Sequence, residues 1–167
     1  MSCTPYFYIE KMNKDTNKYE KVTLYTKPSK YASQETKDRG YAEVDVWPWN
    51  GTHDVFEALK NFPYLSTIGP NLSDEMDEII KKHRNDELFS PNICCINLAD
   101  MYIEYYKNPT VVDYDVEWDE DDINLAPRKE NPLKSVIDRI ESYISLADEM
   151  WDCTTTPSDV RLIYWIY

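Results

Sequence analysis

The pattern of apolar and polar positions predicts strands in the first quarter of the chain. Residues 6–9 and 22–25 are rich in β-branched and aromatic side chains, and a polar turn at 13–17 separates them, so we expect a β-hairpin. The polar stretch 27–40 contains a proline and ends in a glycine, which predicts a loop. Residues 42–47 then alternate well enough to form a third strand.

In the middle of the chain, the apolar positions recur with the spacing of an α-helix. Thr52 is a possible cap for a short helix, and Ser73 for a longer one that starts with acidic and ends with basic side chains. Asn97 precedes apolar positions at i, i+3, i+4 and i+7, which predicts a third helix. The longest helix is expected to run from Pro132 to about residue 150, with Asn131 as its cap and an apolar stripe on one side.

The last residues, 160–167, are too apolar to remain exposed, so we expect a strand inserted beside the early strands. No internal repeat is present. The pattern therefore predicts one α+β domain over residues 1–167. Its antiparallel sheet would contain the N-terminal hairpin, the third strand and the C-terminal strand, packed with three to four helices.

Composition narrows the choice of partners. Thirty-one acidic residues oppose 18 basic ones, which gives a net charge of −13, while 42% hydrophobic and 14% aromatic residues indicate a folded chain. Residues 1–42 hold 8 bases and 5 acids, so the acidity lies in the later part. Such a charge disfavours direct binding to nucleic acid or to anionic membranes and favours basic proteins. The longest apolar runs are too short to span a membrane, and we expect a soluble cytoplasmic protein.

Catalytic and cofactor motifs are not found in the sequence. The four cysteines form no C-x-x-C pair, so we expect reduced thiols without a zinc site or a disulfide framework. His53 and His83 are better explained as structural or exposed residues than as catalytic ones. A nucleophilic pair made of Cys94 or Cys95 and one of the histidines would require the two side chains to meet in the folded chain. This alternative remains open, although nothing in the sequence favours it. Three glycines exclude a Walker or dinucleotide loop, and we expect a non-enzymatic protein without a cofactor.

The densest chemical feature is an acidic run over residues 113–122, with seven carboxylates and no base. We expect this run to bind a partner protein, and the candidate binding residues are Asp113, Tyr114, Asp115, Glu117, Trp118, Asp119, Glu120, Asp121 and Asp122. In an extended conformation, alternate carboxylates would lie about 6.6 to 6.8 Å apart, close to two steps of the phosphate spacing along one DNA strand. The run is therefore a candidate mimic of a nucleic-acid backbone, with Tyr114 or Trp118 as possible anchors.

Two other interpretations of this run remain open. An edge strand or solvated loop can carry acids merely to prevent aggregation. A calcium loop would use Asp113, Asp115 and Glu117 as its first ligands, but Trp118 occupies the position of the required glycine and Asn124 that of the bidentate glutamate.

The second unusual cluster is Trp47-Pro48-Trp49 with the Asn-Gly pair that follows. Two indole rings around a proline are able to line a pocket for a peptide or a nucleotide base. A turn at the end of a strand, with one ring buried, explains the same residues structurally.

Several segments carry a resemblance to a known family. They are Phe7-Tyr8-Ile9-Glu10, His53-Asp54-Val55-Phe56-Glu57-Ala58-Leu59, Gly69-Pro70-Asn71-Leu72-Ser73, Asn97-Leu98-Ala99-Asp100 and Asp159-Val160-Arg161-Leu162-Ile163-Tyr164-Trp165. In their order and spacing over most of the chain, they resemble small uncharacterised accessory proteins of tailed bacteriophages and prophages. The aspartate-x-histidine-serine segment usual in such proteins before the third helix is missing. The resemblance implies an origin, namely a phage protein in the cytoplasm of an infected bacterium, and no reaction.

These observations support two function hypotheses. In the first, the chain is a phage-encoded inhibitor whose acidic surface occupies the nucleic-acid channel of a basic host protein, such as a CRISPR-type defence nuclease. The alternative is a sponge that sequesters a nucleotide immune signal in an aromatic pocket involving Trp47, Trp49 or the tyrosine-rich strands. A third possibility is a phage housekeeping protein whose acidity serves solubility alone.

Overall fold

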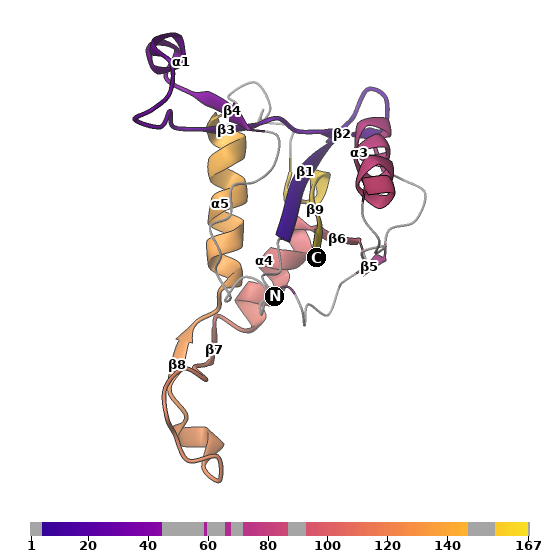
Figure 1. The fold of residues 1–167 in the computed structure, drawn as a ribbon. Coiled ribbons are helices and arrows are strands. Elements are labelled where there is room, and N and C mark those ends of the chain that lie inside the picture. Colours follow the sequence, from indigo (N-terminus) through magenta and orange to yellow (C-terminus); the bar gives the residue numbers. More distant parts are fainter. Residues whose placement is uncertain are drawn as a thin grey trace.

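The computed structural model describes residues 5–44, 59, 66–67, 72–86, 93–146 and 156–166. Its main element is a five-stranded antiparallel sheet (Figure 1). In spatial order the strands are β2 (Lys18–Lys21), β1 (Pro5–Asn13), β9 (Val160–Ile166), β6 (Cys94–Asn97) and β5 (Ser66–Thr67). The α+β class predicted from the sequence is confirmed, whereas the single-domain extent stays a prediction.

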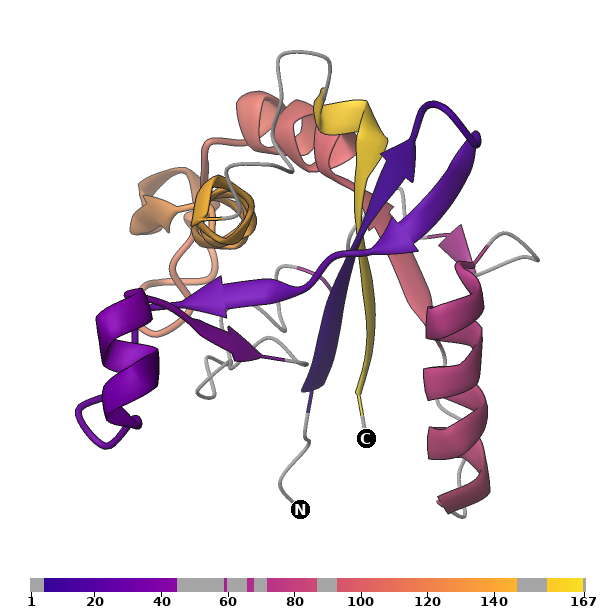
Figure 2. The same cartoon turned by 90° about the horizontal axis from the view of Figure 1, so that it is seen from above.

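The C-terminal strand lies beside the early strand β1, as predicted, and it is the central strand of this sheet. β9 pairs with β1 over seven residue pairs, from Pro5 opposite Ile166 to Lys11 opposite Val160. Side chains alternate between the two faces of a strand, and here both faces are covered. One face of β1 and β9 packs against the helices α4 (Leu98–Lys107) and α5 (Leu133–Leu146), and the other packs against α3 (Asp74–Asp86), as Figure 2 shows from above.

This double burial explains why the tail is apolar at nearly every position. Leu162 and Tyr164 belong to the larger core cluster, whereas Ile163 and Trp165 belong to the smaller cluster under α3. A strand covered on one face only would have shown clean alternation instead.

A buried ion pair also connects the two central strands. Glu10 is fully buried, and its carboxylate accepts a hydrogen bond from Nε of Arg161 at 2.6 Å and one from the backbone N–H of Ser73 at 3.0 Å. The guanidinium of Arg161 stacks on the ring of Tyr19, 3.5 Å from its centroid. The charges of both partners are thus compensated inside the fold.

Three helix starts match the sequence prediction. The Ser73 hydroxyl accepts from the N–H of Met76, the Asn97 side chain from that of Ala99, and the Asn131 side chain from that of Leu133. The predicted apolar stripe of α5 is buried as expected and consists of Leu133, Val136, Ile137, Ile140 and Ile144.

The N-terminal hairpin exists, but its second strand was predicted too late. The Asn13 side chain accepts hydrogen bonds from the N–H groups of Asp15 and Thr16, and Asn17 is left-handed with φ of 54°. This tight turn brings Lys18 directly opposite Asn13, so β2 starts four residues before the apolar run.

The apolar run forms a separate ribbon instead. β3 (Leu24–Thr26) pairs with β4 (Ala42–Val44), so the predicted third strand lies outside the main sheet; its residues 45–47 lie outside the described part. Between these strands, the predicted loop contains the helix α1 (Gln34–Arg39), which Ser33 caps and Gly40 ends at φ of 84°. α1 buries no residue, so hydrophobic periodicity gave no signal for it.

Four sequence predictions fall on residues that the structure does not describe. They concern the helix capped by Thr52, the Trp47-Pro48-Trp49 cluster, His53, and the thiols of Cys3 and Cys153. Within the described ranges, no helix combines the length and the apolar character that crossing a bilayer requires.

Candidate functional site: an acidic arm

The predicted acidic run lies at the end of an arm that projects from the body of the molecule (Figure 1). The arm consists of β7 (Thr110–Val112), β8 (Arg128–Glu130) and the residues between them, which include the 3-10 helix η1 (Ile123–Leu125). β7 and β8 form three residue pairs, from Thr110 opposite Glu130 to Val112 opposite Arg128.

The base of the arm is fixed by buried polar contacts. Asn131 is only 6% exposed. Its side-chain amide donates a hydrogen bond to the backbone carbonyl of Asn108 at 2.8 Å, and its backbone N–H donates one to the backbone carbonyl of Pro109 at 2.9 Å. The same side chain caps α5. One residue therefore joins both ends of the arm to the longest helix.

Within the arm, the acidic run forms turns and is not extended. The Asp113 side chain accepts from the N–H of Asp115 at 3.1 Å, and the Asp119 side chain accepts from that of Asp121 at 3.1 Å. Aspartate favours such turns because its carboxylate satisfies the backbone two residues later. The even carboxylate spacing expected for an extended strand is therefore not formed.

The carboxylates differ in their surroundings. Lys129 of β8 lies 3.6 Å from the Asp113 carboxylate and 3.2 Å from that of Asp115, so one cation serves two acids. Among the described residues, the structure records no cationic or hydrogen-bonding partner for the side chains of Glu117, Glu120, Asp121 and Asp122, and all four are exposed. Together with the exposed Asp119, whose side chain accepts only from a backbone N–H in the described structure, these four carry negative charge that no cation of the arm offsets.

Large apolar side chains are exposed among these acids. Tyr114 is 78% exposed, and its ring lies 6.3 Å from that of the half-buried Trp118. Ile123 and Leu125 of η1 are 60% and 78% exposed, and Val116 is 46% exposed. Tyr114 and Trp118 were predicted as anchors from the sequence, but Ile123 and Leu125 were missed, since their only signal was their position after the last acid.

The structure also describes where other candidate residues lie. His83 is half-buried in α3 with its ring 4.8 Å from that of Tyr6 and 5.4 Å from that of Trp165, so it packs within the fold. Cys94 and Cys95 lie on β6, and burial raises the pKa of both thiols, which disfavours the reactive thiolate. Within the described residues, no three His, Cys, Asp or Glu side chains are grouped to hold a metal ion.

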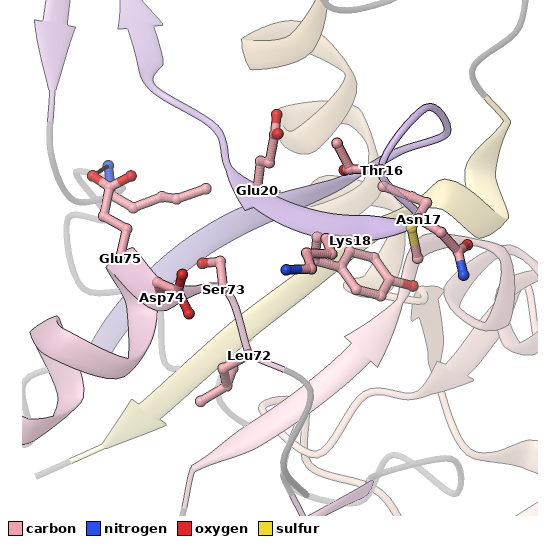
Figure 3. A pocket seen from close by; sticks show the side chains of 11 residues that line it. Thr16, Asn17, Lys18, Glu20, Leu72, Ser73, Asp74 and Glu75 are labelled. Carbon is pink, nitrogen blue, oxygen red and sulfur yellow. Dashed lines mark ion pairs between the residues drawn. The ribbon is translucent and has the colours of Figure 1, made fainter.

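A hollow of about 960 Å³ lies elsewhere, between the hairpin of β1 and β2 and the start of α3 (Figure 3). Its walls carry both signs of charge: Lys18 and Lys21 line it together with Glu20, Asp74 and Glu75, and Lys21 lies 3.5 Å from the Glu75 carboxylate. The mixed charge selects no particular class of small ligand.

Comparisons of this chain with protein-family models, with curated proteins and with solved structures found no match. The resemblance to phage accessory proteins thus stays a prediction. The geometry and charge of the arm are therefore the basis for a functional proposal.

Proposed function

We propose that this chain is a non-enzymatic inhibitor that binds a basic nucleic-acid-binding protein through its acidic arm. The observation that carries the proposal is the composition of the arm's surface: unpaired carboxylates surround exposed apolar side chains on a segment that projects from the body. Exposed apolar groups within a charged rim are a usual composition of protein-binding surfaces.

The expected mechanism is electrostatic competition. A surface that binds nucleic acid is lined with lysine and arginine, and the arm offers it carboxylates in place of phosphates. Because the acidic run is folded into turns, we expect it to neutralise a cluster of cations without reproducing the regular phosphate spacing. Tyr114, Ile123 and Leu125 would supply the apolar contacts that hold one orientation.

The kind of partner follows from the charge and from the resemblance to phage proteins. We propose a host defence protein in the cytoplasm of an infected bacterium. A CRISPR-type nuclease fits this description because its duplex channel is strongly basic and its inhibition benefits a phage directly.

Charge removal on the arm tests the proposal. The variant Glu117→Gln, Glu120→Gln, Asp121→Asn and Asp122→Asn retains the shape of each side chain. A matched control, Asp15→Asn, Glu35→Gln, Asp38→Asn and Glu78→Gln, removes the same charge from exposed positions outside the arm. Both variants and the wild-type chain are used to capture proteins from host lysate at low and high salt, and the captured proteins are identified by mass spectrometry.

We expect the wild-type and control chains to capture the same basic protein at low salt and to release it at high salt, since the screening length falls from about 10 Å at 0.1 M to about 3 Å at 1 M. At about 0.5 to 1 kcal/mol for each exposed pair, the arm variant should bind that protein about 30-fold to several-hundred-fold more weakly. Equal binding by the arm variant, or equal loss in the control, would overturn the proposed role of the arm.

A further inference from the structure

A second hollow, of about 670 Å³, lies between the β3–β4 ribbon and α5, away from the acidic arm's tip. Figures 1 and 2 both show the ribbon passing beside this helix. Tyr25, Thr26 and Lys27 line it from the ribbon side. From the other side it is lined by residues of α5 together with Glu130, and the α5 residues are Lys134, Ser135, Asp138, Arg139, Ser142 and Tyr143.

The charges of this hollow differ from those of the rest of the chain. Three of the residues that line it are basic and two are acidic, in a protein with a net charge of −13. The Asp138 carboxylate is already paired with the ammonium of Lys134 one helical turn away. Glu130 accepts a hydrogen bond from the Tyr105 hydroxyl at 3.2 Å. Both acids therefore have partners within the protein.

The other two cations of the hollow are placed to contact a ligand. Lys27 is exposed, and among the described residues the structure records no acidic partner for it. Arg139, also exposed, donates a hydrogen bond to the hydroxyl of Tyr143, whose side chain is buried beneath. A guanidinium has five N–H donors in a planar fork, so one arginine is able to contact more than one acceptor. Ser135 is exposed and adds a hydroxyl donor.

We propose that this hollow binds a small molecule that carries a phosphate group, with Lys27 and Arg139 as its charged contacts. The volume lies within the range of small-molecule sites, and the paired donors of an arginine match phosphate oxygens. The ring of Tyr25 is half-buried, and its centroid lies 5.3 Å from that of Tyr41 with the two ring planes nearly perpendicular. We expect a base to stack on this ring. A nucleoside monophosphate therefore fits better than phosphate alone.

Titration of the full-length protein with AMP, adenosine and inorganic phosphate, followed by NMR or calorimetry, tests this inference. We expect AMP to bind more tightly than phosphate and adenosine not to bind measurably. Lys27→Gln and Arg139→Gln should each weaken AMP binding about 10-fold, the loss of one charge-assisted contact. Tyr25→Leu should weaken AMP binding but leave phosphate binding unchanged.

Two controls make the result decisive. Lys37→Gln removes an exposed cation of α1 that does not line the hollow, and it should bind AMP as the wild-type chain does. The four-site arm variant should also retain AMP binding, which separates this inference from the proposed function of the arm. Arg139→Gln removes a contact with a buried tyrosine, so the melting temperature of this variant is measured as well. If Arg139→Gln unfolds, Lys27→Gln, which changes an exposed side chain, still tests the inference independently.

No AMP binding by the wild-type chain at millimolar concentration would overturn the inference. The inference also fails if Lys27→Gln and Arg139→Gln both bind as tightly as the wild-type chain, or if Lys37→Gln loses affinity to the same extent. Phosphate binding equal to AMP binding would contradict the stacking role of Tyr25.

Discussion

The central strand pair and the acidic arm are both antiparallel pairs of strands, but they use their side chains in opposite ways. β1 and β9 form seven residue pairs with both faces covered, and even a charged residue of each strand, Glu10 and Arg161, has its partner inside the fold. β7 and β8 form three pairs and end in exposed carboxylates and apolar groups. The first pair stabilises the fold. The second contributes little burial and is free to serve recognition, so changes in the two regions should have separable effects.

Removing β9 tests the central pair most severely. Deletion of residues 160–166 removes five apolar side chains that are at most 4% exposed. At about 1.5 to 3 kcal/mol each, the loss is roughly 7 to 15 kcal/mol, as large as the stability of a typical domain. We expect little soluble protein and no cooperative melt by circular dichroism. A truncated chain that melted at the wild-type temperature would refute the central role of β9.

A single substitution at the buried ion pair should have the next largest effect. Arg161→Met leaves the Glu10 carboxylate buried without its cation, and we expect a loss of about 3 to 5 kcal/mol in urea unfolding. Replacing both residues by Met should cost less than Arg161→Met, because no charge is then left uncompensated.

The control for this prediction is a more exposed pair, between the turn of the N-terminal hairpin and the 3-10 helix η2 (Pro157–Asp159). Lys14 lies 3.2 Å from Asp159, with 48% of its side chain exposed, so Lys14→Ala should cost less than about 1 kcal/mol. Equal losses for Lys14→Ala and Arg161→Met would mean that burial does not distinguish the two pairs.

Asn131 connects the two regions, so its substitution sharpens the comparison. Asn131→Ala removes the cap of α5 and leaves the Asn108 carbonyl without its donor, at a cost of about 2 kcal/mol. Amide hydrogen exchange should then rise in β7 and β8 and stay unchanged in β1 and β9. Asn131→Asp keeps the acceptor that caps α5, so the free energy of unfolding should fall less than in Asn131→Ala. Faster amide exchange in β1 and β9 would contradict the separation of the two regions.

The smallest effect on stability is expected at the end of the arm. Ile123→Ser and Leu125→Ser replace side chains that are 60% and 78% exposed, so the free energy of unfolding should change by less than about 0.5 kcal/mol. Capture of the partner protein should nevertheless fall, since these groups would lie in the interface. A clear loss of stability would show that the two side chains pack within the chain instead.

Prediction from the sequence succeeded where the local signals agreed on one structure. The caps at Ser73, Asn97 and Asn131 and the apolar stripe of α5 were predicted because side-chain chemistry and periodicity agreed. It failed where local turn geometry decided, as at Asn17, which starts β2 early, and at α1, which has no apolar face. The candidate site was identified by its charge, but its turns and the exposure of Leu125 depend on tertiary structure.

The pairing of β1 with β9 also has a consequence for biosynthesis. The two strands at the centre of the sheet come from opposite ends of the described chain, so the contact order is high and folding is expected to be slow. At 5 to 20 residues per second, roughly 8 to 30 seconds separate the translation of β1 from that of β9. During that interval Phe7, Tyr8 and Ile9 lack their partner residues in β9, so we expect this apolar segment to stay exposed on the nascent chain and to be bound by chaperones.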